Sequence, residues 1–468
     1  MVDFTATRVF RAGTSTLAPI SGLSDHRGPC AWDQGDRGVS AGSRLRCGHH
    51  DYCAENAVRR SPVQIRPALR VVVVGGGILG IATARLIARE RRDSEVILID
   101  KEVALARHQT THNSGVAHAG LYYAPGSLKA RLCRRGIGLL RSYCSEHGLR
   151  YDACGKLVLA TRDGEVEPLR RLAERAQDNG VPGLRWCSAD ELVEIEPHAR
   201  GVAALHSPET AIVDFGEVAD ALAAEFLTAG GTVRTGTEVR RVVRGSGHRG
   251  QNVSVVLADG EALAADRVIV CAGLQSDRLA RASGQPAAPR IVPFRGEYWR
   301  LPAGPAELVR GLIYPVPDPA LPFLGVHLTR RLDGSLWLGP SAILALSREG
   351  YGRADVSLRD LGETLAWPGT WRMFARHWRA GLQELDHAAR RSAFLAEVRR
   401  YVPAIPDADV VRAPAGIRAQ ALDRDGSLVD DFRLALDGGV AWVRNAPSPA
   451  ATSSLAIAEE LTSRALGD

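Results

Sequence analysis

Residues 112–123 place several reactive side chains within a short stretch of the chain. The run HNSGVAHAGLYY holds two histidines, an amide, a hydroxyl and two tyrosines, together with two glycines. Imidazole gains and loses protons near neutral pH, and the other polar groups can hydrogen-bond to oxygen atoms of a ligand. Neither a buried strand nor an amphipathic helix needs this mixture. A loop held against a cofactor or substrate is therefore predicted, with a polar surface loop as the alternative.

A dinucleotide-binding fingerprint precedes this loop and favours the first interpretation. Residues 70–74 (RVVVV) are typical of a strand buried on both faces of a parallel sheet. Gly75, Gly77 and Gly80 follow in G-x-G-x-x-G spacing. In such a motif the first glycine permits a tight turn, the second lets the backbone approach a pyrophosphate, and the third allows close helix packing. The helix that begins there would direct its N–H groups at the phosphates.

An acidic residue ends the second strand of the same unit. The apolar run at 95–99 leads to Asp100, twenty residues beyond Gly80. A carboxylate at that place is positioned to accept hydrogen bonds from a ribose hydroxyl. Strand, helix, strand and acid thus occur in the order of a Rossmann-like unit, although these motifs alone do not separate FAD from NAD.

Two later segments favour FAD. The strand-like run RVIVCAG ends in Ala272 and Gly273, where a tight turn would bring backbone near the ligand. Near the C-terminus a strand leads through the small-residue turn NAPSPAATSS into a helix. The start of that helix could stabilise negative charge on the pyrimidine edge of a flavin, whereas an ordinary strand–helix connection is the alternative. The candidate contacts in this turn are Ala451, Thr452 and Ser453.

Composition and charge exclude several other classes of protein. The chain has 468 residues, 45% of them hydrophobic and 24% charged, and its 59 basic and 53 acidic residues give a net charge of +6. No block of lysine and arginine indicates nucleic-acid binding. The longest apolar run is broken by glycines and by Arg85, which excludes a membrane span, and no secretory signal is predicted. The eight scattered cysteines suit a reducing compartment. We expect a cytoplasmic protein, with peripheral contact at the inner face of the cell membrane left open.

Residues 1–66 differ from the rest because they show no sustained helical or strand period. The run CGHHDYC at 47–53, with Cys30, invites a zinc interpretation. However, its spacing is not that of paired zinc ligands, and the flanks carry no folding signal. No metal site is predicted, and we expect this stretch to be either disordered or the product of a misplaced start.

The remaining chain is predicted to form two lobes. Helices are expected at 127–147, at about 163–180, at 215–229 and within 355–400, where Trp367, Trp371 and Trp378 are assigned to core packing. Strands are expected at 232–235, in a hairpin of 239–243 and 253–257, and in an antiparallel sheet over 288–345.

The predicted fold class is α/β. A Rossmann-like FAD-binding domain would be assembled from discontinuous segments, residues 67–150, 200–285 and 410–468. An α+β substrate domain with a mostly antiparallel sheet would contain residues 151–199 and 286–409.

In the segments described so far and in several others, the chain resembles a known family, the FAD-dependent L-2-hydroxyglutarate dehydrogenases and oxidases. This family lies within the D-amino-acid-oxidase-like flavoprotein superfamily. Besides the fingerprint, the matching segments are HNSGVAHAGLYYAPGSLKARLC at 112–133, CAGLQSDRLA at 271–280, PFRGEYWRL at 293–301, IYPVPDPALPFLGVHLT at 313–329, GIRAQAL at 416–422 and NAPSPAATSSLAI at 445–457. They span essentially all of 70–468, and nothing matches a motif for covalent flavin attachment.

The resemblance implies non-covalent FAD and oxidation of (S)-2-hydroxyglutarate to 2-oxoglutarate. A hydride would pass from C2 to flavin N5 while a base removes the hydroxyl proton, and the electrons would go on to a respiratory-chain quinone or to oxygen. His327 is preferred as the base, and His118 as a group beside the flavin or positioning the substrate. Arginine suits bidentate pairing with the carboxylates of a diacid.

The candidate site residues fall into two further groups. The candidate substrate-binding residues are Arg295, Arg418, Tyr298, Tyr123 and Lys129. The candidate cofactor-binding residues are Gly75, Gly77, Gly80, Asp100, Asn113, Ser114, Gly115, Ala272, Gly273, Ala451, Thr452 and Ser453.

Two other classes of function are considered. The same fold supports flavoenzymes that act on an amino acid or on glycerol 3-phosphate, but the segments at 112–133, 313–329 and 445–457 are more specific to the hydroxyglutarate branch. A non-catalytic dinucleotide-binding protein would not need the polar side chains of residues 112–123.

Overall fold

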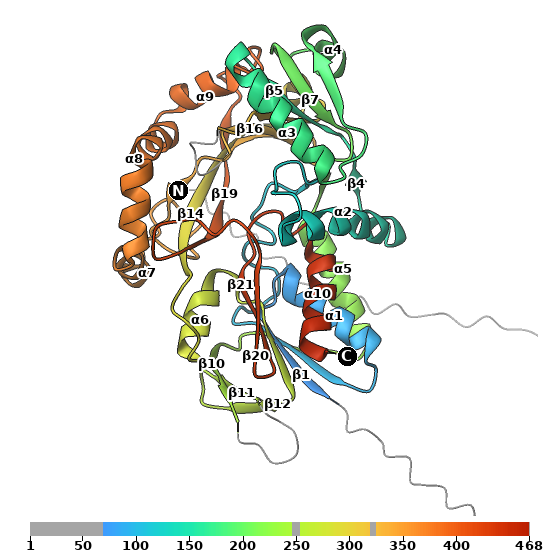
Figure 1. The fold of residues 1–468 in the computed structure, drawn as a ribbon, viewed down its shortest axis with the longest axis vertical. Helices are drawn as coiled ribbons and strands as arrows, with labels where there is room; N and C mark the ends of the chain where they lie inside the picture. Colours follow the sequence, from blue (N-terminus) through green and yellow to red (C-terminus); the bar gives the residue numbers. More distant parts are fainter. Residues whose placement is uncertain (1–68, 246–252, 319–323, 468) are drawn as a thin grey trace, which may run out of the picture. The chain divides into compact units, whose positions relative to one another are not determined.

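Two large sheets organise the part of the chain that the computed structural model describes, residues 69–245, 253–318 and 324–467. The N-terminal extension and its run at 47–53 lie outside these residues. The described residues belong to one compact unit, in which helices pack on faces of both sheets (Figure 1).

The first sheet joins strands from four separate parts of the described chain. In order across the sheet, the strands are β20 (Arg433–Asp437), β21 (Val440–Asn445), β13 (Arg267–Val270), β1 (Arg70–Val74), β2 (Glu95–Ile99) and β9 (Thr232–Arg234). All neighbours pair in parallel except β20, which is antiparallel to β21 at one edge. The prediction of a Rossmann-like domain built from discontinuous segments is confirmed.

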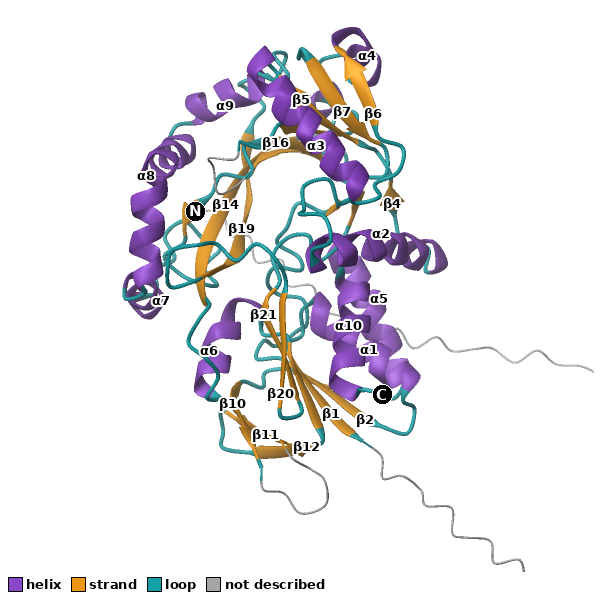
Figure 2. Cartoon of the chain, in the orientation of Figure 1, coloured by secondary structure: helices purple, strands orange, loops and turns teal. Residues whose placement is uncertain are grey.

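Apolar layers cover both faces of this sheet, which explains the unbroken valine and isoleucine runs of β1 and β2. Helices α1 (Ile78–Glu90), α5 (Phe215–Thr228) and α10 (Ser454–Leu466) pack on one face (Figure 2). The other face packs against helix α6 (Ser276–Ala282) and a small antiparallel sheet of β10 (Val239–Arg244), β11 (Val253–Leu257) and β12 (Ala262–Ala265). The predicted hairpin is formed by β10 and β11.

The second sheet has nine strands among the described residues. Eight of them lie in the order β18 (Ile343–Leu344), β14 (Arg290–Leu301), β17 (Leu336–Gly339), β16 (His327–Arg330), β15 (Leu312–Pro315), β5 (Lys156–Ala160), β7 (Ala203–Ser207) and β6 (Arg185–Ser188), and β19 (Val411–Leu422) pairs with β14. Among the described strands of this sheet, only β15 and β5 pair in parallel. The prediction of a mostly antiparallel sheet in the second lobe is confirmed.

The predicted boundaries placed residues 200–285 and 410–468 with the first sheet. Two strands at the beginning of these ranges, β7 and β19, lie in the second sheet instead. β7 pairs along its length with β5, and β19 pairs with β14 from Arg290↔Leu422 to Arg300↔Val411. Both strands therefore belong to the second sheet and not to the first. Local sequence patterns show that a strand exists, but the strand's partner depends on residues far away in the chain.

Helices cover the outside of the second sheet. They are α3 (Val166–Asp178), α4 (Ala189–Ile195), α7 (Leu358–Leu365), α8 (Pro368–Ala389) and α9 (Arg391–Arg399). Short 3₁₀ turns occur at Asp163–Glu165 and Pro305–Leu308, and a third, Gly273–Gln275, joins β13 of the first sheet to α6. Core packing is confirmed for Trp367, which is 7% exposed. It is wrong for Trp371 and Trp378, which are 58% and 56% exposed on α8. Helical spacing alone does not tell whether a second element covers a helix face.

Helix α2 (Leu128–Glu146) follows the polar loop and holds it in place. Ser127 caps the helix by accepting a hydrogen bond from the N–H of Ala130, as the predicted start at 127 requires. The loop itself pairs through β3 (Val116–Ala117) with β8 (Ala211–Val213), which also pairs with β4 (Tyr151–Asp152).

Helix α2 also packs closely on the turn before α10. A Cβ atom added at Gly136 would lie 2.6 Å from Cα of Ser453 and 2.7 Å from the carbonyl oxygen of Thr452. Two residues along the same helix, Gly138 has nothing within 4 Å of such an atom. Only the first glycine is therefore required by packing.

These two glycines form a matched pair for a stability test. Alanine is favoured over glycine inside a helix by about 1 kcal/mol, so Gly138→Ala should raise the melting temperature slightly. Gly136→Ala should instead lower it and reduce bound flavin, because backbone atoms must move. Thermal unfolding and flavin absorbance measure the two effects. Equal melting temperatures for the two variants would contradict the packing argument.

Candidate active site

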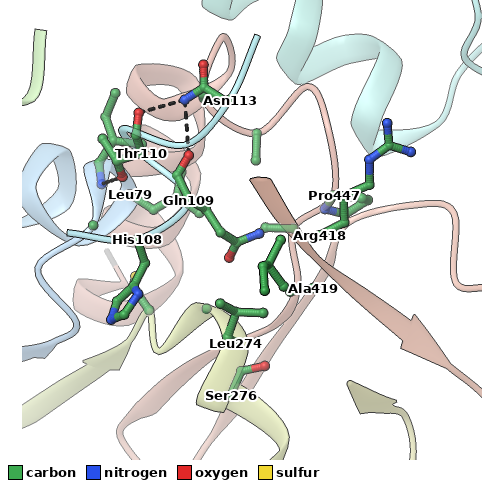
Figure 3. Close-up of a pocket in the computed structure, with 18 of the residues that line it drawn as sticks. Leu79, His108, Gln109, Thr110, Asn113, Leu274, Ser276, Arg418, Ala419 and Pro447 are labelled. Atoms are coloured by element: carbon green, nitrogen blue, oxygen red, sulfur yellow. Dashed lines mark hydrogen bonds between the residues drawn. The ribbon is translucent and has the colours of Figure 1, made fainter. Parts of the chain in front are cut away.

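A cavity of about 1030 Å³ lies between the two sheets and is lined by segments from both. Figure 3 shows lining residues from the start of α1, from the loop at 108–113, from the turn leading into α6, from β19 and from the segment after β21. Because the carboxyl ends of β1 and β13 open towards it, the cavity lies where ligands bind in parallel sheets.

The glycine loop forms one wall of the cavity. Gly75 has a φ of +109°, and a Cβ atom there would lie 2.3 Å from the carbonyl oxygen of Cys271. A Cβ atom at Gly80 would lie 1.9 Å from the carbonyl oxygen of Gly75. Only glycine fits these two positions, because side chains would push helix α1 and β13 away from the loop.

Gly77 and Asp100 complete this wall. Gly77 precedes α1 as its N-cap. The atom nearest to a Cβ built on it is Oγ1 of Thr110, 3.5 Å away, so there is room for a ligand above the backbone. Asp100 accepts a hydrogen bond from the N–H of Gly76 at 2.5 Å and another from the N–H of Glu102 at 2.7 Å. The carboxylate therefore holds the loop, and each oxygen retains acceptor capacity for a ribose hydroxyl.

His327 lies in the opposite wall at the start of β16 and is 5% exposed. Its Nδ1 lies 3.0 Å from the carbonyl oxygen of Gly325. A carbonyl only accepts hydrogen bonds, so we assign the proton to Nδ1 and the lone pair to Nε2. The pKa of His327 is lowered to about 3, mainly by burial and also by the charges of Arg418 and Lys156, whereas the hydrogen bond to Gly325 acts in the opposite direction. The imidazole is therefore neutral near pH 7, with a lone pair on Nε2.

His118 also lines the cavity and is neutral. Burial lowers its pKa well below the ordinary value, and the charges of Lys156, His327 and Lys129 contribute. Its backbone N–H donates to Oγ1 of Thr452 at 3.1 Å. Nδ1 is buried without a hydrogen-bond partner in the described structure, so it is suited to a ligand.

The two candidate arginines lie on different faces of the second sheet. Across the β14–β19 ladder, Arg418 pairs with Phe294, whereas Arg295 pairs with Ile417. Successive residues of a strand point to opposite faces, so Arg418 lines the cavity and Arg295 does not. The Arg295 guanidinium donates to the carbonyl oxygen of Gly352 and lies 3.3 Å from the Glu297 carboxylate.

The other three candidates for substrate binding, Tyr298, Tyr123 and Lys129, line the cavity. The Lys129 ammonium donates to the backbone carbonyl of Asp430 at 2.9 Å and to its carboxylate at 2.8 Å. Its charge is thus already partly compensated by Asp430.

Comparison with known proteins agrees with this geometry. Residues 70–464 match the model of the DAO family, described as FAD dependent oxidoreductase. The chain belongs to this family. Its relatives include mitochondrial L-2-hydroxyglutarate dehydrogenases of Nematostella vectensis (45% identical; 87% of this chain and 92% of the relative) and Homo sapiens (45%; 83% and 86%). The L-2-hydroxyglutarate dehydrogenase of Escherichia coli K12 is 42% identical over 84% of this chain and 92% of its own.

Solved structures with the same fold are more distant in sequence. L-alpha-glycerophosphate oxidase from Mycoplasma pneumoniae with FAD bound has a TM-score of 0.69 at 21% identity, over 86% of this chain and 95% of that one. Glycine oxidase from Bacillus cereus has a TM-score of 0.63 at 16% identity, over 85% and 95%. At these identities the likeness concerns the fold of this DAO-family protein.

FAD is the cofactor of the family, and the residues of this DAO-family protein fit it. Gly77 leaves the start of α1 without a capping side chain, and the candidate cofactor residues Ala272, Gly273, Ala451 and Thr452 line the cavity. Ser453 does not line it and is buried under α2. The expected FAD site thus has room at its phosphate-binding end and small residues along its length.

Two predicted cofactor residues shape the polar loop of this DAO-family protein. The Asn113 amide donates to the carbonyl oxygens of Gln109 (3.0 Å) and Thr110 (2.6 Å), and its oxygen accepts from the N–H of Gly115 (2.7 Å; Figure 3 shows the first two bonds). Gly115, with a φ of +73°, lies outside the cavity lining beside Arg331. Ser114 does line the cavity.

Sequence reasoning missed several residues of this site. Thr110 accepts a hydrogen bond from the N–H of Ile78 at 3.0 Å and so connects the polar loop to α1. Tyr122 and Tyr314 line the cavity, and the Tyr314 ring stacks on His327 with ring centres 3.9 Å apart. Both tyrosines stand in segments that carry the family resemblance, so a fuller use of those segments would have found them. No sequence signal marks Thr110.

Proposed function

We propose that this protein oxidises (S)-2-hydroxyglutarate to 2-oxoglutarate with FAD. Its similarity to L-2-hydroxyglutarate dehydrogenases over most of the chain supports this substrate. The observation that carries the proposal is the pairing of a proton acceptor with a cation in one wall. The imidazole of His327 carries its lone pair on Nε2, and Arg418 lines the same cavity.

The residues of the cavity divide the chemical tasks. Bound FAD supplies the acceptor for the two electrons and the hydrogen that leave C2 of the substrate. Arg418 pairs with one carboxylate, and Tyr298 and Tyr123 donate hydrogen bonds to substrate oxygens. Nε2 of His327 takes the proton of the C2 hydroxyl. His118 binds or positions the ligand from the loop beside the glycine motif.

Substrate identity is tested by anaerobic reduction of the bound flavin. (S)-2-hydroxyglutarate should bleach the flavin absorbance, whereas its R enantiomer, glycine and glycerol 3-phosphate should leave it unchanged over the same time. Bleaching by glycerol 3-phosphate or by an amino acid instead would contradict the proposed substrate and assign the protein another activity that this fold supports. Re-oxidation by air or by a soluble quinone analogue then identifies the electron acceptor, for which we propose a quinone or oxygen.

The assignment of the base is tested by substitution. His327→Asn should retain FAD and substrate-induced changes in the flavin spectrum, while flavin reduction slows by about 10²–10⁴-fold. His118→Asn serves as the comparison, with a smaller effect on the reduction rate and a larger one on ligand affinity. Wild-type reduction in His327→Asn together with slow reduction in His118→Asn would reverse the two roles.

We also propose peripheral contact with a membrane, through the exposed face of α8. This apolar face consists of Trp371, Trp378, Leu382 and Leu385, each more than half exposed. Trp378, Leu382 and Leu385 are spaced by four and three residues and therefore lie along one side of the helix. Trp371 precedes them, beyond a kink at His377 (φ −118°, ψ 22°). No helix in the described ranges is long and apolar enough to cross a membrane.

Charge complementarity supports an anionic lipid surface as the partner of this face. Exposed arginines at 372, 376 and 379 flank the apolar residues of α8. A helix with aromatic and leucine residues on one side and arginines beside them is suited to the boundary between headgroups and acyl chains. Contact there would bring the protein to membrane quinones.

Membrane contact is tested by sedimentation with lipid vesicles. The protein should bind vesicles rich in phosphatidylglycerol and bind phosphatidylcholine vesicles weakly. The double substitution Trp371→Gln and Trp378→Gln should reduce binding severalfold, because it removes most of the aromatic surface. Leu227→Gln, at a site 55% exposed on α5, is the matched control and should bind as the wild type does. Equal binding of all variants would exclude the α8 face.

A further inference from the structure

Lys156 begins β5 beneath the aromatic wall of the cavity. Its side chain is 1% exposed, and Nζ has no hydrogen-bond partner within the described structure. The amine lies 4.0 Å from the ring centre of Tyr314 and 5.2 Å from that of Tyr122. Both rings line the cavity, whereas Lys156 does not. The amine therefore faces the substrate space through a layer of aromatic rings.

A buried ammonium group is costly without an anion close to it. The groups that favour the charged form of Lys156 are the thiols of Cys133 and Cys154 and not a carboxylate. Burial raises the pKa of both thiols to about 12, so they are neutral near pH 7. Cation–π contact with two rings offsets part of the desolvation. The protein itself thus supplies little stabilisation for a positive charge here.

A dianionic ligand in the cavity would supply the missing charge. The field of Lys156 already reaches the cavity, because it lowers the pKa of both His118 and His327. Binding and charging must then favour each other by the same free energy, since thermodynamic linkage is reciprocal.

We propose that Lys156 is a positioning residue that selects doubly charged substrates, because binding of a dicarboxylate is coupled to uptake of one proton from solvent by its amine. A five-carbon diacid carries a second carboxylate that butyrate, the monoacid with hydrogen in its place, lacks. Lys156 would recognise this extra charge without touching it. The proposal rests on the proposed function only for the identity of the diacid.

The expected pH dependence follows from the groups around the amine. Burial lowers the pKa of Lys156 to about 7 in the ligand-free protein. Above pH 7 the free amine is neutral, so the dissociation constant of a diacid should rise by up to tenfold per pH unit, and below pH 7 it should be constant. Lowered pKa values keep His118 and His327 neutral in this range, and raised ones keep Tyr122 and Tyr314 neutral. Two further cations act on the same imidazoles: the charge of Arg418 lowers the pKa of His327, and the charge of Lys129 lowers that of His118.

The experiment measures binding of glutarate, a diacid that cannot be oxidised at C2, to the holoenzyme from pH 6 to pH 9. Flavin absorbance gives the dissociation constant, and calorimetry in phosphate and Tris buffers gives the number of protons taken up. Wild-type protein should take up close to one proton at pH 8, and its dissociation constant should rise above pH 7. A constant that does not change across this range would overturn the proposal without any variant.

Two substitutions separate charge from packing. Lys156→Met keeps the length of the side chain and should weaken glutarate binding at pH 6.5 about a hundredfold, abolish proton uptake, and leave butyrate binding unchanged. Lys156→Arg should retain glutarate binding but lose its pH dependence. Equal weakening of glutarate and butyrate by Lys156→Met would mean a structural role and refute the proposal. Failure of (S)-2-hydroxyglutarate to reduce the flavin would instead count against the proposed function alone.

Discussion

The hydroxyl of Thr452 connects the two segments on which the candidate site depends. Its Oγ1 accepts a hydrogen bond from the N–H of His118 at 3.1 Å and donates one to the carbonyl oxygen of Val116 at 3.3 Å. The turn that carries Thr452 also packs on Gly136 of α2. One buried side chain thus holds the polar loop against the start of α10, although more than three hundred residues separate the two segments. His118 and the small-residue turn from Asn445 to Thr452 line the same cavity.

The second sheet provides the other wall through the alternation of its strands. β14 and β19 pair over most of their length, so a residue on either strand faces the cavity or the opposite side according to its register. Because of this geometry, Arg418 lines the cavity and Arg295 does not, although both lie in segments that carry the family resemblance. It also brings Tyr314 of β15 and His327 of β16 into contact. A shift of one residue in any of these pairs would replace the polar wall with an apolar one.

In this wall, the pKa values of the ionisable side chains are shifted more by burial than by ion pairs with neighbouring residues. Two imidazoles and one amine lie in a region with cations and rings, where the described groups offer them little compensating negative charge. Such a site holds neutral bases and binds anions well, because an incoming carboxylate supplies the charge that the protein omits. The same arrangement would disfavour a neutral or cationic ligand.

Much of this protein can be deduced from sequence alone, because some constraints are local. The valine strand, the three glycines and Asp100 act within one βαβ unit, so their spacing suffices to indicate a dinucleotide fold. The capped start of α2 at Ser127 and the β10–β11 hairpin are local in the same sense. The segments that carry the family resemblance indicate the substrate class. They also contain the candidates His118, His327 and Arg418, and all three line the cavity.

The remaining features depend on contacts between distant segments, and only the tertiary structure decided them. β7 and β19 join the second sheet because of partners far along the chain. Arg295 does not line the cavity because its position in the β14–β19 register differs from that of Arg418. Trp371 and Trp378 are exposed because no described element covers that side of α8. Lys156 looked like an ordinary strand residue in the sequence. Its importance follows from the rings that the fold places over it, since burial and neighbouring charges, and not residue type, determine whether an amine carries a proton.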